Sequence, residues 1–153
     1  MELGASVMNE IPHISLGVRK EPSTTYGGNL LPLLHQIHYG LDQLQTLGEP
    51  CFIDLSSLPL APAEQTALLD FLGMGEVQIS IHNLGGSKIW ESRFPGVWVV
   101  EHLNEQGDCL ARHLEIANFP YLARSQAEDI AFGLEQLEDG LKTLADTERG
   151  DSP

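Results

Sequence analysis

Histidines and acidic residues are the side chains of this sequence whose types and spacing could bind a metal ion. His35, His38 and Asp42 stand at positions i, i+3 and i+7 of a predicted helix, which places them along one stripe. Two imidazoles and a carboxylate could hold zinc or nickel. The same spacing also occurs on a solvated helix flank, with a contact between His38 and Asp42. We favour this second interpretation, because the ligand pattern that surrounds specific zinc motifs is missing.

Three further histidines fall on or beside neighbouring predicted strands and could cluster in space: His82, His102 and His113. Histidines on strands are mostly solvated or serve as hydrogen-bonded core groups, and we favour that interpretation over a ligand role. A metal or iron–sulfur carrier that uses surface histidines, either His35 and His38 with Asp42 or the strand histidines, is the alternative function.

No motif of the sequence indicates catalysis. The turn Gly73-Met74-Gly75-Glu76 follows a predicted helix and precedes a predicted strand, the reverse of the order found in phosphate-binding loops. No G-x-S-x-G motif, P-loop or cysteine-nucleophile signature occurs, and no partner is visible for four carboxylates: Asp54, Glu91, Glu101 and Glu115. We therefore predict a protein that is not an enzyme and that holds no cofactor.

The charge of the chain narrows the class of partner. Its 8 basic and 22 acidic residues give a net charge of −14, which repels nucleic acid and anionic membrane surfaces and favours basic proteins or segments. No apolar run reaches the length of a membrane span, and the N-terminus lacks the basic region of a secretory signal, so we predict a cytoplasmic protein. Cys51 and Cys109 have no C-x-x-C spacing and are predicted to be buried, reduced residues.

The length of 153 residues predicts one domain, over residues 28–146, after a loosely ordered arm at 1–27 and before a disordered tail at 147–153. Hydrophobic periodicity and helix-end residues predict helices at 29–47, 62–72 and 125–145, and strands at 51–55, 76–82 and 109–118. Between these strands lies Ser87–Val100, an aromatic and β-branched run that holds both tryptophans. We predict one long strand here, bent at Pro95-Gly96, because a two-residue Pro-Gly hairpin would be strained.

This order of elements predicts an α+β fold, a largely antiparallel meander packed by about three helices. In the first and last helices the apolar residues step by four and three, as in a coiled coil. The last helix has this stripe: Ile130, Leu134, Leu137, Leu141 and Leu144. Since each stripe covers barely two heptads, we favour a face that packs on the sheet.

Five blocks of sequence, in order, resemble the C-terminal domain of the HupH/HyaF hydrogenase expression and formation proteins. The resemblance runs from about residue 28 to 144, and its blocks are NLLPLLH (29–35), IDLSSLPL (53–60), LGMGEV (72–77), ESRFPGVW (91–98) and SQAEDI (125–130). It implies an accessory, chaperone-like protein that assists maturation of nickel–iron uptake hydrogenases and binds the small iron–sulfur subunit before export. The leader of such a subunit carries a twin-arginine motif, a basic segment that suits an acidic partner.

The resemblance implies no catalytic residue in this sequence. Its motif residues are candidates for partner binding or for a structural role: Gly73, Gly75, Glu76, Glu91, Arg93, Phe94, Pro95, Gly96 and Trp98. Relatives commonly hold two copies of this domain, whereas this chain holds one. An apolar surface that the second copy would cover is then exposed, so we expect a homodimer, with the meander edge and the last helix as contributors.

Overall fold

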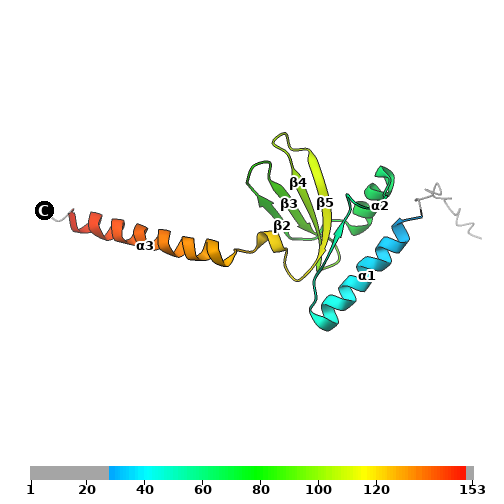
Figure 1. Ribbon diagram of the computed structural model, residues 1–153, viewed down its shortest axis with the longest axis horizontal. Helices are drawn as coiled ribbons and strands as arrows, with labels where there is room; N and C mark the ends of the chain where they lie inside the picture. Colours follow the sequence, from blue (N-terminus) through cyan, green and yellow to red (C-terminus); the bar gives the residue numbers. More distant parts are fainter. Residues whose placement is uncertain (1–27, 151–153) are drawn as a thin grey trace, which may run out of the picture.

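The computed structural model describes residues 28–150, which form three α-helices, five strands and one 3₁₀ turn. The elements follow each other along the chain as α1 (Leu30–Leu47), β1 (Cys51–Asp54), α2 (Pro62–Leu72), β2 (Gln78–Ile81), β3 (Ser87–Glu91), β4 (Val97–Leu103), β5 (Cys109–Ile116), η1 (Tyr121–Ala123) and α3 (Ala127–Gly150). Figure 1 shows α1 and α2 beside the sheet and α3 extending away from it. The predicted arm at 1–27 lies outside the described residues. None of the described helices combines the length and the apolar character needed to cross a membrane.

The five strands form one antiparallel sheet in the order β1-β5-β4-β3-β2. Strands β2 to β5 make a meander, and β1, which comes earlier in the chain, pairs with β5 at the edge. The predicted α+β fold with an antiparallel sheet is therefore confirmed.

The prediction of one long bent strand at Ser87–Val100 was wrong. This stretch forms two paired strands, with Ile89 opposite Val100 and Glu91 opposite Trp98. The five residues from Ser92 to Gly96 connect them, so the chain does not need the strained two-residue hairpin that we considered.

The connection contains the turn type that Pro-Gly favours. The amide of Val97 donates to the carbonyl oxygen of Phe94 at 3.0 Å, and Gly96 has a φ of +89° at the third position of the turn. This left-handed backbone conformation is the reason for glycine at this place, since side chains disfavour it.

Helices α1 and α2 cover one face of the sheet. Leu33 and Ile37 of α1 and Leu68 and Leu72 of α2 are at most 5% exposed. They pack against the residues that alternate along the strands on this face: Ile53, Val97, Val99, Leu114 and Ile116. The opposite face holds a smaller cluster, made of Ile89, Trp98 and Val100 with the partly buried Ile79 and Ile81.

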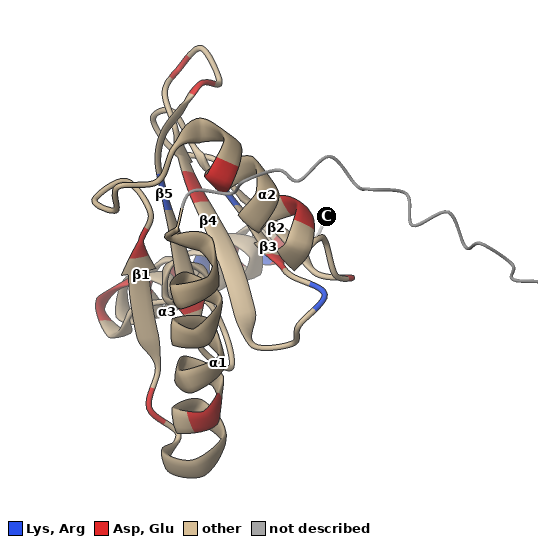
Figure 2. Cartoon of the chain, turned by 90° about the vertical axis from the view of Figure 1, so that its right-hand side faces the viewer, with Lys and Arg blue, Asp and Glu red and all other residues tan. Residues whose placement is uncertain are grey.

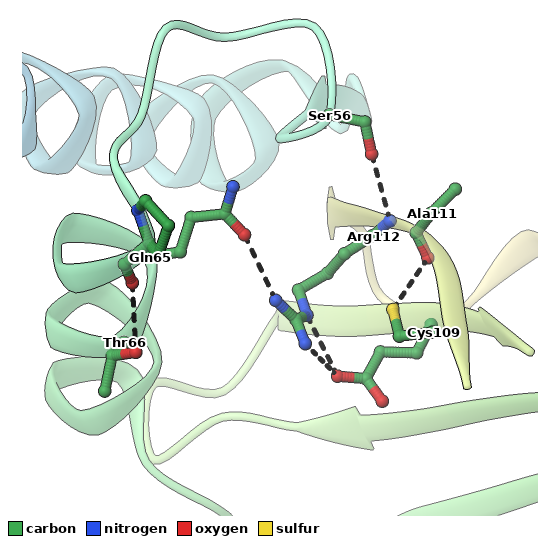
Figure 3. A network of polar contacts seen from close by, with 8 residues as sticks. Ser56, Gln65, Thr66, Cys109, Ala111 and Arg112 are labelled. Atoms are coloured by element: carbon green, nitrogen blue, oxygen red, sulfur yellow. Dashed lines mark hydrogen bonds and ion pairs between the residues drawn. The ribbon is translucent and has the colours of Figure 1, made fainter. Parts of the chain in front are cut away.

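A polar network ties α2 to the sheet. Arg112 of β5 donates from Nη1 to Oε1 of Gln65 on α2 and, from Nε and Nη2, to Oε1 of Glu101 on β4. Figure 3 shows the guanidinium of Arg112 directed toward Gln65 of α2. The main-chain amide of Arg112 also contacts the β1–α2 loop, because it donates to Oγ of Ser56 at 3.3 Å.

Helix α3 departs from the predicted packing. Its 24 residues include none that is buried, and Figure 1 shows it projecting from η1 without a neighbour. About three helices were expected to pack on the sheet, whereas α1 and α2 do so and α3 does not. The helix also continues to Gly150, so residues 147–150 are helical where we predicted a disordered tail.

The cysteine prediction was wrong in part. Cys51 is half-buried, but Cys109 is exposed, because β5 begins directly after the turn that joins it to β4. Both thiols are free.

Candidate partner-binding surface

The residues of the β3–β4 loop hold one another in place. Oε1 of Glu91 accepts a hydrogen bond from the amide of Gly96 at 3.0 Å. Oγ of Ser92 accepts one from the amide of Phe94 at 3.1 Å and donates to the carbonyl oxygen of the same residue at 3.0 Å. Pro95 lies exposed at the corner. These bonds give the loop one rigid conformation.

The second motif, Gly73–Glu76, lies directly against this loop. The amide of Gly75 donates to the carbonyl oxygen of Glu91 at 2.7 Å, and the amide of Arg93 donates to the carbonyl oxygen of Leu72 at 2.9 Å. A Cβ on Gly75 would come within 2.6 Å of the carbonyl oxygen of Ser92, so only glycine fits. The fold therefore brings two motifs together that are separated in sequence.

Trp98 and Glu76, the outer residues of the two motifs, differ in exposure. Trp98 is 3% exposed, and its indole N–H donates to the carbonyl oxygen of Ala117 at 3.0 Å. Its ring meets Phe119 edge to face, with 6.2 Å between centroids. Trp98 thus has a structural role, whereas Glu76 is exposed in the turn.

An exposed cation–aromatic cluster is the part of the motif that faces outward. The guanidinium of Arg93 lies 5.2 Å from the ring centroid of Phe71 and 5.3 Å from that of Phe94. The two rings stack with 5.5 Å between centroids. A narrow apolar groove of about 210 Å³ between α1 and α2 begins at these rings. Among the motif residues beside this groove, Arg93 is exposed and Phe94 is half-buried.

A larger depression, of about 450 Å³, opens on the sheet face that α1 and α2 leave uncovered. Its rim carries exposed apolar and aromatic side chains: Phe52 of β1 is 57% exposed, Tyr121 of η1 is 54% exposed and Leu122 is 43% exposed. Sequence reasoning missed these residues. The alternation in β1, where Phe52 and Asp54 face away from buried Ile53, is the signal that could have indicated them.

Glu115 lies in this depression with an incomplete set of hydrogen bonds. It is 2% exposed, and its Oε1 accepts from the amide of Tyr121 at 2.6 Å, while Oε2 has no donor among the described residues. Burial raises the pKa of this carboxyl, and the hydrogen bond from Tyr121 and the charge of Arg124 act in the opposite direction.

Two of the three strand histidines meet beside Glu115. The rings of His102 and His113 stack with 5.5 Å between centroids, and Nδ1 of His102 lies 3.1 Å from Oγ of Ser87. Burial and the neighbouring His102 lower the pKa of His113, and Asp54 partly opposes them. His82 is exposed in the loop after β2 and does not join the pair.

The candidate metal ligands on the first helix are all exposed. His35, His38 and Asp42 lie on the outer side of α1. Within residues 28–150, no three His, Cys, Asp or Glu side chains come close enough together to hold an ion.

Comparison with known proteins places this fold in a family. Residues 28–144 match the family described as HupH hydrogenase expression protein, C-terminal conserved region. A solved structure of the hydrogenase expression protein HupH from Thiobacillus denitrificans superimposes with a TM-score of 0.71 and 40% identity, covering 78% of this chain and 97% of that one.

Two curated relatives extend the match. The hydrogenase expression/formation protein HoxQ of Azotobacter vinelandii is 30% identical over 93 residues, 61% of this chain and 33% of that protein. HupH of Rhizobium leguminosarum bv. viciae is 25% identical over 136 residues, 88% of this chain and 48% of that protein. The chain therefore spans about a third to a half of the length of these relatives. Since the family match covers most of the chain, the protein belongs to the HupH family of hydrogenase expression proteins, as the C-terminal conserved region.

Proposed function

We propose that this chain is a non-catalytic accessory protein of hydrogenase maturation in the cytoplasm. Its client is an immature subunit of a nickel–iron uptake hydrogenase, the small iron–sulfur subunit, which it holds as a chaperone does. The relatives' names as hydrogenase expression/formation proteins support the maturation role. The client follows from the resemblance described above, and the compartment follows from the sequence prediction based on the missing membrane span and signal region.

The observation that carries the proposal is the uncovered depression with Glu115 in it. Apolar side chains that are about half exposed at its rim, Phe52 and Tyr121, can bury area against a client. Glu115 lines the same depression and adds a carboxylate there, which attracts a basic group of a client. A binding surface of this kind needs no catalytic group.

The charge of the whole molecule indicates which client segment fits. Acidic residues lie on the helices and loops around the sheet, whereas basic residues are few (Figure 2). A basic segment of the subunit precursor, such as a twin-arginine leader, is attracted over a long range by this field.

A binding titration with purified small-subunit precursor tests the proposal. Glu115→Gln removes the charge and one acceptor at the depression, and we expect affinity to fall about tenfold, the equivalent of 1.4 kcal/mol. Tyr121→Ala should also weaken binding, because it removes apolar contact at the rim.

Asp70→Asn is the matched control. Asp70 is exposed on α2, on the other side of the sheet, so the substitution changes the net charge by the same amount without touching the depression. If Glu115→Gln and Asp70→Asn reduce the affinity equally, the effect is due to net charge alone. The depression would then not be the binding site. No binding of the wild-type chain to the precursor would overturn the proposed client.

A further inference from the structure

Helix α3 presents an apolar stripe that no other part of residues 28–150 covers. Five residues recur along it at spacings of four and three, and each is between 58% and 64% exposed: Ile130, Leu134, Leu137, Leu141 and Leu144. An apolar stripe of this length on a monomer is a surface that usually has a partner.

The helix also needs a partner for its own stability. Gly133 and Gly140 lie in its interior, and each costs about 1 kcal/mol relative to alanine. Helical stability in proteins comes mostly from packing of an apolar face, and α3 has no such packing among the described residues. Only the charges at its ends favour it, with Glu128 and Asp129 in the first turn and Arg149 in the last.

We propose that the partner is α3 of a second copy, and that two chains dimerise through a parallel two-stranded coiled coil. The four-three spacing is the heptad repeat in which knobs fit into holes, and a partner must carry the same repeat to fit. A second α3 supplies it. With Leu134 and Leu141 at the a positions, Ile130, Leu137 and Leu144 occupy the d positions of just over two heptads.

The residues that flank the seam permit close approach of two identical helices. The e and g positions hold mostly small side chains: Ala131, Gly133, Gly140, Ala145 and Thr147. Most charged residues of α3 lie at the b, c and f positions, away from the seam. The exposed ion pair of Asp139 and Lys142 is an example. A helix with a net negative charge can therefore pair with itself without placing many like charges in contact.

Glu138 is the one charged residue among these flanking positions, and it disfavours one way of pairing. In a parallel pair, g faces e of the partner, so Glu138 lies opposite glycine. In an antiparallel pair, a packs against d and e faces e. The register with Leu137 opposite Leu141 would bring the two copies of Glu138 together, whereas the register with Leu134 opposite Leu137 would place Glu138 beside Ala131. Like charges in such contact destabilise the pair. Parallel pairing avoids this contact.

Sedimentation of the full chain over micromolar to hundred-micromolar concentrations tests the dimer. We expect the mass to rise from 16.8 kDa to twice that value with concentration. Added salt should favour the dimer, because it screens the repulsion between two chains of charge −14. Leu137→Asp should abolish dimerisation throughout this range, since it places a charge in the seam.

Phe132→Asp is the matched control, because Phe132 is 60% exposed on the opposite side of α3 and the charge change is the same. It should leave the dimer intact. Because α3 does not pack on the sheet, neither substitution should change the melting of the domain. A single 16.8 kDa species at every concentration, or equal effects of the two substitutions, would overturn the proposal.

Cross-linking tests the direction. In a Cys51→Ala, Cys109→Ser background, Leu144→Cys should form an intermolecular disulfide under mild oxidation, since equivalent d positions meet in a parallel pair. Phe132→Cys should not. If the dimer forms but Leu144→Cys does not cross-link, parallel pairing is overturned.

Discussion

Glu101 and Arg112 form a fork-like contact between two adjacent strands, in which Oε1 of Glu101 accepts from Nε at 2.9 Å and from Nη2 at 2.7 Å of Arg112. The two side chains are 15% and 21% exposed. They lie on the face that α2 covers, where Arg112 also reaches Gln65. One guanidinium therefore ties two strands and a helix together.

Replacing Arg112 should destabilise the domain. Arg112→Met keeps the aliphatic length but leaves a largely buried carboxylate without donors, which costs about 1–3 kcal/mol. Chemical denaturation measures this loss, and a double-mutant cycle with Glu101→Gln gives the coupling between the two residues. Lys142→Met breaks the other ion pair, whose side chains are 73% and 80% exposed, and should leave the unfolding curve unchanged. Equal curves for Arg112→Met and wild type would contradict the role of the contact.

A second stability prediction concerns the β3–β4 turn. Gly96→Val forces a β-branched side chain to a φ of +89°, and such backbone strain costs about 1–3 kcal/mol. Its Cβ would also lie 3.3 Å from Cδ2 of Leu41. Gly107→Val is the comparison, because Gly107 has a φ of +87° but no neighbour within 4 Å. Thermal melting should show the larger loss for Gly96→Val. A variant that melts with wild type would contradict the strain at this turn.

Much of the fold could be predicted because its signals are local. The helix at 62–72 was predicted with its observed bounds, and the other elements differ by a few residues at their ends. The β3–β4 hairpin was missed because its connection is wider than the Pro-Gly pair itself. The hydrogen bond between Glu91 and Gly96 closes that loop, and the hydrophobic periodicity of the sequence could not predict it.

The surfaces were harder to predict than the elements. A four-three stripe looks the same whether it packs on the sheet, as in α1, or stays exposed, as in α3. The choice depends on the path of the chain after η1, a long-range property. Likewise, Glu115 had no visible partner in sequence, because its contact with Tyr121 depends on how the chain turns after β5.

His113 predicts how stability depends on pH. Its pKa in the folded state is lowered from 6.5, so the unfolded chain binds more protons between the two values. His113 therefore does not lower the free energy of unfolding above pH 6.5. The free energy of unfolding should decrease as the pH falls from 6.5 to the folded-state pKa of His113. His113→Gln should lose less stability over this window, whereas His35→Gln on the exposed side of α1 should follow wild type. Parallel curves for His113→Gln and wild type would show that His113 does not contribute.

The last prediction concerns the rate at which the chain meets its client. With a net charge of −14, the chain should associate quickly with a basic precursor segment at low ionic strength and more slowly as salt screens the attraction. Stopped-flow association with a leader peptide, at several salt concentrations, measures this slope. A peptide with its arginines replaced by glutamine should show a slower rate and a flatter slope. Because salt should strengthen the α3 dimer, the two associations have opposite salt dependence and can be told apart in one preparation. An association rate that does not change with salt would refute electrostatic steering of the client.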